Sequence, residues 1–386
     1  MKKLTLVAAG VLSLVALPAM AQSTVTLYGL IDAAVTYTTK QNGTNRTGID
    51  AGQIATSRWG MRGSEDLGGG MRAFFNIEST LINDTGAAGL GFGGNTVPPG
   101  PFGEPRGAST SLFDRAALVG LSGGFGSLSM GRQNILGVDS IGLADPISLA
   151  HPATNPNVAF SALNASFIYN TYGTNQGGAA LRQNNSIRYL TPVFGGGFGG
   201  ALMYGAGEQA GSSSKSDYKG ISGYYRKGNS GAALAYAKLN NQADTSTLTL
   251  VGGGVKYEIN PMFTLKTTYA QNKQSLSNRK IAVFGLGVDT LFSPAVTLTL
   301  AYYNTKSSGE TTFADKKADQ YYVIGKYALS KRTSLYSSFT HARAGSALIA
   351  AETGATGNFR NLTQGLINEL GARSANRLTA GVVHTF

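Results

Sequence analysis

The sequence predicts an all-β protein, a 16-stranded antiparallel transmembrane β-barrel with one loop folded into its lumen. Three observations predict this fold. Apolar and polar side chains alternate in short segments along most of the chain, which is the period of a strand with two different faces. The connections between these segments are alternately short and long, as in barrels of an outer membrane. Beyond the N-terminus no run approaches 18 consecutive apolar residues, so a chain that spans a bilayer has to close into a barrel.

The N-terminus has the three parts of a secretory signal peptide. Met1-Lys2-Lys3 is positively charged, Leu4 to Leu17 is apolar, and Ala19-Met20-Ala21 is a small-residue cleavage site. The alternative is a transmembrane anchor, but the apolar run is shorter than the roughly 20 residues that an anchor needs. We therefore expect residues 1–21 to be removed and residues 22–386 to form one exported barrel.

Composition narrows the class of partner. The chain has 386 residues, 53 of them glycine, and no cysteine, which excludes disulfides and thiol chemistry. Its 32 basic and 20 acidic residues give a net charge of +12, which favours anionic partners such as small anions or lipopolysaccharide phosphate. The basic residues are scattered singly and the aromatic residues show no nucleic-acid-binding pattern, so no nucleic acid partner is expected. His151, His341 and His384 lack ligand-like spacing, so neither a metal nor a cofactor is predicted.

Sixteen segments carry the strand alternation. It is clean where Val296, Leu298 and Leu300 alternate with Thr297 and Thr299. The predicted strands are 24–38, 53–65, 71–81, 112–122, 126–134, 182–194, 198–208, 217–227, 231–241, 247–259, 263–274, 279–292, 296–308, 319–329, 333–344 and 375–386.

The connections fall into two sets. One set is very short and rich in Gly, Asn and Pro, as in Gly195-Gly196-Gly197 and Asn260-Pro261-Met262, which are tight-turn residues. The other set is longer and polar: 39–52, 82–111, 135–181, 209–216, 275–278, 309–318 and 345–374.

The longest connection, residues 135–181, is the segment around which the chain is organised. A loop of this length within a regular chain is usually functional or disordered. The flanking segments resemble barrel strands, so the loop has room inside the barrel, where it would narrow a pore. We call residues 135–181 the constriction loop.

Strand parity predicts which charged residues line the lumen. Trp59 and Met61 suit lipid, which turns Arg58 and Arg62 inward. An Arg or Lys facing lipid at the bilayer midplane costs about 2–4 kcal/mol, so the parity has a physical basis. In 112–122, Ala116 and Leu118 look lipid-facing, which would turn Arg115 inward, although Phe113, Val119 and Leu121 share its face. The same test places these residues in the lumen: Arg72, Glu78, Arg182, Arg188, Lys256, Glu258, Lys266, Lys326 and Arg377.

Glycines inside the predicted strands have a structural explanation. Gly252-Gly253-Gly254 and Gly285-x-Gly287 are not followed by helices. They therefore indicate close packing and barrel curvature and not a phosphate-binding loop.

Four stretches together resemble the general trimeric porins of β-proteobacteria. They are Val25 to Asp32, Ser57 to Gly68, the run from Gly120 to Arg132, and the terminal His384-Thr385-Phe386. The resemblance covers essentially the whole mature chain. It implies an outer-membrane homotrimer in which the loop after the fifth strand forms the constriction.

The resemblance also implies roles for particular residues. The family's basic wall matches Arg58, Arg115 and Arg182, with Arg62 and Arg188 as neighbours. Asp139 and Asp145 match loop acids that face this wall, and Phe386 with His384 match a signal read by the outer-membrane assembly machinery. The Pro-Glu-Phe-Gly stretch of many porins is absent, and Asp145-Pro146-Ile147 is the nearest equivalent.

These features predict a water-filled channel for passive diffusion of ions and small hydrophilic solutes, with a preference for anions from its inward arginines. Two other classes remain. An outer-membrane barrel enzyme needs a Ser-His-acid group, for which His341 is the strand histidine near a loop end. A soluble exported β adhesin needs neither lipid-facing parity nor a terminal aromatic, and the chain has both.

Overall fold

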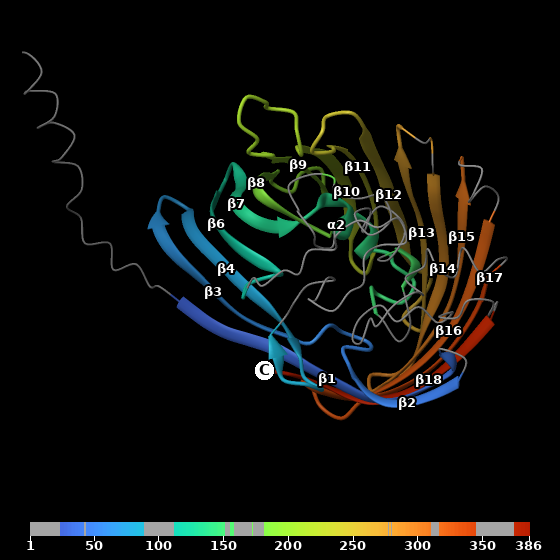
Figure 1. The fold of residues 1–386 in the computed structure, drawn as a ribbon. Helices are drawn as coiled ribbons and strands as arrows, with labels where there is room; N and C mark the ends of the chain where they lie inside the picture. The colour runs from blue at the N-terminus through green and yellow to red at the C-terminus, as the bar shows by residue number, and fades with distance from the viewer. Residues whose placement is uncertain are drawn as a thin grey trace, which may run out of the picture.

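The computed structural model describes residues 24–41, 44–88, 112–150, 155–157, 172, 181–276, 278, 280–309, 316–344 and 374–386. The expected signal peptide and most of the constriction loop lie outside these residues. Within them, sixteen antiparallel strands form a closed ring (Figure 1), which confirms the predicted fold class. The ring closes where the first strand pairs with the last, from Leu30 opposite Thr385 to Thr38 opposite Arg377.

The barrel strands follow the chain in order around the ring. They are β1 (Thr24–Gln41), β3 (Arg58–Gly68), β4 (Met71–Ile82), β6 (Ala116–Gly123), β7 (Gly126–Asn134), β8 (Arg182–Leu190), β9 (Phe198–Gly205), β10 (Tyr218–Lys227), β11 (Ser230–Asn240), β12 (Thr247–Glu258), β13 (Phe263–Gln274), β14 (Lys280–Ser293), β15 (Val296–Ser308), β16 (Lys316–Ala328), β17 (Thr333–Ala344) and β18 (Ser374–Thr385).

Two further strands were not predicted. Residues 39–52 were expected to form a loop, but β1 continues to Gln41 and β2 (Thr44–Ala51) folds back on it. The physical reason is that β3 pairs with β1 only up to Leu30, so the rest of β1 needs a partner for its backbone groups. The second is β5 (Ala87–Ala88), which pairs with the end of β4.

Residues 53–57, predicted to begin a strand, instead form a bend before β3. The carboxylate of Asp32 holds this bend by accepting the backbone N–H of Ile54 at 2.7 Å and that of Ala55 at 2.8 Å. Tyr336 of β17 donates to the same carboxylate. Ile54 packs against the buried cluster inside the barrel, so the bend contributes to the lumen.

The two faces of the wall differ as the alternation predicts. Large apolar side chains such as Leu27, Leu234 and Leu300 are exposed on the outside, where a membrane barrel contacts lipid. The structure agrees with the predicted parity of β3 and β4, because Met61 lies opposite the exposed Leu27 of β1 and opposite Ile77 of β4, on the outer face. A soluble adhesin would not present such an apolar belt.

The parity predicted for 112–122 was wrong. Ala116 lies opposite Glu78 and therefore faces the lumen, whereas Val119 and Leu121 are 59% and 44% exposed on the outside. Both faces of this strand are apolar, so its sequence alone did not distinguish them. Arg115 directly precedes β6 and is not constrained by its pleat.

The C-terminal residue completes the seam of the barrel. The backbone N–H of Phe386 donates to the carbonyl of Gly29 at 3.0 Å, and the N–H of Gly29 donates to the carbonyl of Phe386 at 3.1 Å. The Phe386 ring covers Gly29, where a Cβ atom would clash with it. His384 bonds Thr333 of β17 at 2.9 Å.

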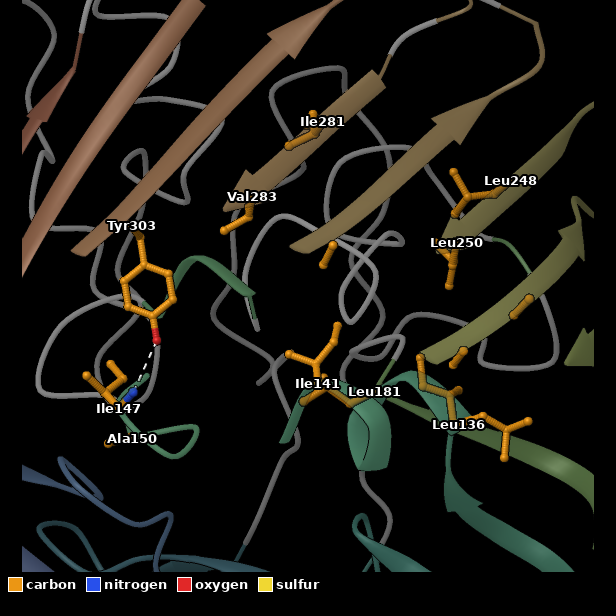
Figure 2. Close-up of a cluster of buried hydrophobic side chains, with 14 of the residues drawn as sticks. Leu136, Ile141, Ile147, Ala150, Leu181, Leu248, Leu250, Ile281, Val283 and Tyr303 are labelled. Carbon is orange, nitrogen blue, oxygen red and sulfur yellow. Dashed lines mark hydrogen bonds between the residues drawn. The ribbon is translucent and has the colours of Figure 1, made fainter. Parts of the chain in front are cut away.

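The start of the constriction loop lies inside the ring. It includes the short helix α2 (Leu136–Gly142), which contacts β10 to β13. Leu136, Ile141 and Leu181 are buried near Leu248 and Leu250 of β12 (Figure 2). Among the described residues, no helix is both long and apolar enough to cross a bilayer.

Candidate pore constriction

The described part of the constriction loop is seated on glycines. A Cβ atom added to Gly254 of β12 would lie 2.8 Å from the Cβ of Ala144, and one added to Gly287 of β14 would lie 2.8 Å from the Cβ of Pro146. Gly285 approaches the Pro146 ring in the same way. The glycines therefore give the loop room to approach the wall, which is the close packing that their positions predicted.

The carboxylate of Asp145 fastens the loop to this wall. It accepts hydrogen bonds from the backbone N–H of Ile147 and Leu149, from the side-chain amides of Asn155 and Asn157, and from the Tyr303 hydroxyl of β15, at 2.8–3.2 Å. Only 1% of Asp145 is exposed. This differs from the expectation that Asp145 faces the arginines across the pore, because its charge is already satisfied by five donors beneath the loop.

A second attachment lies beside the first. The Lys266 ammonium of β13 donates to the Ser148 hydroxyl at 2.9 Å and forms a salt bridge of 2.6 Å with Asp289 of β14. Ser148 and Leu149 both have φ of 58°, so the loop makes a left-handed turn here, which is uncommon for residues other than glycine. Figure 2 shows the nearby bond from the Ile147 amide to Tyr303.

Substitution of Gly287 by Val is expected to displace the loop, because the added side chain would overlap Pro146. Overpacking of this kind costs about 1–3 kcal/mol. Single-channel recording should then show a higher conductance than that of the unmodified protein.

Gly325→Val is the matched control, since a Cβ atom at Gly325 has no neighbour closer than 4.0 Å. An unchanged conductance for Gly287→Val would mean that this contact does not hold the loop.

Two arginines flank one carboxylate on the opposite wall, and a third arginine lies buried beside them. The Arg115 Nε lies 2.5 Å from Glu78 Oε1, and the Arg58 Nε lies 3.9 Å from Glu78 Oε2. Arg182 is buried and interacts electrostatically with both Arg115 and Glu78. We call Arg58, Arg115 and Arg182 the arginine cluster. It has a net charge of +2 when Glu78 is included.

The cluster and the docked loop occupy opposite sides of the ring. Glu78 is on β4, and the strands that hold the loop are centred on β13, eight strands further along a closed ring of sixteen. Side chains of opposite walls face each other across the lumen of such a barrel. The space between the two walls is therefore bounded by cations on one side and by the loop on the other.

The remaining predicted residues have different partners. The Arg62 guanidinium lies over the Tyr28 ring, 5.2 Å from its centroid. Arg188 forms a salt bridge with Asp139, so this acid ties α2 to β8 and does not face the arginine cluster.

Two residues at the pore constriction, Glu78 and Ile54, have roles that the sequence did not predict. Glu78 was predicted to face the lumen, but its position between the arginines was not. Ile54 lies in the bend before β3, which no strand pattern could reveal.

A cavity of about 810 Å³ is lined by Ile54 and Ala55 of this bend and by Ile147, Ser148 and Ala150 of the constriction loop. The charged residues that line this cavity are Asp289, Lys326, Lys331 and Arg332.

Groups for catalysis or metal binding do not assemble in the described part of the chain. No cluster of three or more His, Asp or Glu side chains that could hold a metal is found there. The His341 ring, the strand histidine near a loop end, contacts the side-chain amide oxygen of Asn376 at 2.7 Å.

A closed barrel with an apolar outer belt, a charged lumen and a loop attached inside it defines a membrane channel of the porin class. The chain belongs to the Gram-negative porin family, whose model matches residues 7–346. It is therefore an outer-membrane channel protein.

Individual relatives agree with this assignment. The chain is 31% identical over 336 residues to outer membrane porin protein 32 of Delftia acidovorans, covering 82% of this chain and 83% of the relative. It is 27% identical to major outer membrane protein P.IB of Neisseria lactamica, over 84% of this chain and 89% of that protein. The fold is similar to that of an anion-selective porin from Comamonas acidovorans, with a TM-score of 0.71, 24% identity, and coverage of 95% of this chain and 100% of that one.

Proposed function

We propose that this porin conducts small anions and other small hydrophilic solutes by passive diffusion, with a preference for anions. The observation that carries the proposal is the arginine cluster, in which Arg58 and Arg115 flank one carboxylate and the buried Arg182 interacts electrostatically with both Arg115 and that carboxylate. Its positive field raises the local concentration of anions in a confined, low-dielectric lumen. The Comamonas acidovorans protein of similar fold is an anion-selective porin, which supports the same direction.

In this proposal the basic wall of the constriction consists of Arg58, Arg62, Arg115, Arg182 and Arg188, and the loop of residues 135–181 limits its width. Arg188 is paired with Asp139 of the loop, whereas Arg115 and Arg58 share the Glu78 carboxylate of the wall. The protein performs no chemistry on the solute and needs no cofactor.

Export and assembly complete the proposal. Residues 1–21 direct secretion and residues 22–386 form the barrel. Phe386 and His384 serve as the assembly signal, and the pairing of Phe386 with Gly29 supports a part for the C-terminus in closing the barrel. The functional unit is a homotrimer in a leaflet of lipopolysaccharide. OmpT of Vibrio cholerae, a protein of similar fold, has been solved in a trimer form.

The reversal potential in a planar bilayer under a salt gradient tests the anion preference. We expect an anion-favouring potential for the purified protein, and a two- to fivefold lower anion-to-cation permeability ratio for Arg58→Gln. This factor corresponds to about 0.4–1 kcal/mol, the interaction of two unit charges about 4–10 Å apart in water. Arg58 suits the test because it is the least buried of the cluster, with 30% of its side chain exposed.

The control is Lys227→Gln, which removes one positive charge at the exposed short-turn end of β10. It should leave the permeability ratio unchanged. A cation-favouring or neutral reversal potential for the unmodified protein would retain the channel and refute the anion preference.

A further inference from the structure

The cavity of about 810 Å³ between the bend of residues 53–57 and the docked start of the constriction loop has two chemically different parts. At one end it includes Leu30 of β1, which lies opposite Arg58 of the arginine cluster. At the other end it reaches the short turns that contain Pro294 and Lys331, and short turns are periplasmic in outer-membrane barrels. The cavity therefore lies on the route between the arginine cluster and the periplasm.

One part of the cavity is apolar. Ile54 of the bend packs against the buried cluster that contains Ile147, Ala150 and Ile324, and all four residues line the cavity together with Leu30. Ile147 and Ala150 belong to one turn of the loop (Figure 2), in which the Ala150 N–H donates to the Ile147 carbonyl at 3.0 Å. A small inorganic ion gains nothing from such a surface, whereas a hydrocarbon group gains free energy by leaving water to contact it.

The two sides of this apolar part are held in place by buried carboxylates. Asp32 accepts the backbone N–H of Ile54 at 2.7 Å and that of Ala55 at 2.8 Å. Asp145 accepts the backbone N–H of Ile147 at 3.2 Å. Asp32 and Asp145 are 0% and 1% exposed. The space between the bend and the loop is therefore preformed, which lowers the cost of binding a solute there.

The other part of the cavity is basic. Lys326 of β16, and Lys331 and Arg332 in the turn that follows, line it. Within the described part of the chain these three residues form no salt bridge. The acid of the lining, Asp289, is already paired with Lys266 at 2.6 Å. This part of the cavity therefore has an excess of positive charge.

The turn that carries Lys331 and Arg332 has a defined backbone. The Ser330 hydroxyl accepts the backbone N–H of Arg332 and that of Thr333, both at 3.1 Å. The Arg332 carbonyl accepts the backbone N–H of Thr385 at 2.8 Å, which joins the turn to β18. The two cations are thus anchored at the short-turn end of the cavity.

We propose that this cavity binds monocarboxylates with a short hydrocarbon body. The carboxylate lies toward Lys326, Lys331 and Arg332, and the hydrocarbon body lies against Ile54 and Ile147. Sites for small molecules have volumes of about 300–1,000 Å³ and a mostly apolar lining with a few placed polar groups, and this cavity has both properties. The inference rests on the proposed function, because the ligand enters through the same anion-preferring pore, and it adds a second site with its own class of solute.

Block of the potassium chloride current in a planar bilayer tests the proposal. The probes are acetate, hexanoate and hexanol at neutral pH, which vary the charge and the hydrocarbon body separately. We expect hexanoate to block with a half-blocking concentration at least about tenfold lower than that of acetate, because its additional methylene groups leave water. Hexanol lacks the charge and should not block at the same concentration.

Two variants locate the site. Ile54→Ser should raise the half-blocking concentration of hexanoate about threefold or more, because an apolar contact is lost, and should leave that of acetate unchanged. The double variant Lys326→Gln and Lys331→Gln should raise both concentrations, because it removes the charges that attract the carboxylate.

The matched control is the double variant Lys227→Gln and Lys256→Gln, which removes two positive charges from residues that do not line the cavity. It should leave both half-blocking concentrations unchanged. If Ile54→Ser fails to fold, as judged by its heat-dependent electrophoretic mobility, Ile54→Ala replaces it with the same expectation. The comparison of acetate with hexanoate on the unmodified protein needs no variant.

Three results would overturn the proposal. Equal half-blocking concentrations of acetate and hexanoate would exclude recognition of the hydrocarbon body. Block by hexanoate that both variants leave unchanged would exclude this cavity. Block by hexanol as strong as that by hexanoate would assign the effect to the membrane. The reversal potential in potassium chloride alone tests the anion preference separately, so a missing preference with retained hexanoate block would refute the proposed function and leave this site in place.

Discussion

Asp145→Ala is expected to release the constriction loop from the wall and to raise the single-channel conductance. The substitution removes the acceptor of five hydrogen bonds, among them those from Tyr303, Asn155 and Asn157. The donors that lose this carboxylate are buried. Breaking a buried network of hydrogen bonds to a charged group costs about 3–5 kcal/mol. The barrel strands do not depend on these bonds, so this loss concerns the docked position of the loop.

Single-channel recording of the Asp145→Ala protein would measure the effect. We expect larger and less uniform conductance steps and a weaker ion preference, since the lumen would widen. Tyr303→Phe removes one of the five donors and should give a smaller change in the same direction. Asp244→Asn, in the loop between β11 and β12, is the control for loss of an acidic charge. Conductance steps that match those of the unmodified protein would show that Asp145 does not hold the loop.

The barrel could be predicted because its signal repeats. A strand with lipid on one side and water on the other has to alternate, and an outward charge is costly, so each of sixteen segments carries the same information. The prediction was wrong where that contrast is missing. In β6 both faces are apolar, and only the pairing of Ala116 with Glu78 shows which one lies inside. The hairpin of β1 and β2 was missed because its exposed polar residues resemble a loop.

The constriction was less predictable because its contacts join distant parts of the chain. The resemblance to porins pointed to Arg58, Arg115 and Arg182, and the structure places Arg58 and Arg115 against Glu78, with the buried Arg182 interacting electrostatically with Arg115. No pattern in the loop could show that Asp145 turns toward Tyr303, 158 residues away in the sequence. A single acid in an irregular segment has no periodicity from which its direction follows.

Glu78→Gln and Arg115→Gln are expected to change the ion preference in opposite directions. Both remove one charge from the same ion pair of 2.5 Å; Glu78→Gln keeps the shape of the side chain and Arg115→Gln shortens it. Glu78→Gln removes the acid that the arginine cluster surrounds, and the net charge of the group rises from +2 to +3, so the anion-to-cation permeability ratio should increase. Arg115→Gln lowers the net charge to +1, so the ratio should fall. Each substitution should change the anion-to-cation permeability ratio by about two- to fivefold, the range expected for Arg58→Gln.

The pair of variants separates charge from shape. Loss of either partner breaks the same salt bridge, so an effect of the broken bridge alone would move both reversal potentials in one direction. Opposite shifts require that the charge itself act on the permeating ions. The shifts should also shrink as the salt concentration rises, because screening shortens the range of the field. Glu258→Gln, on β12 away from the cluster, should produce a smaller shift than Glu78→Gln, since the interaction weakens with distance from the narrow part of the pore.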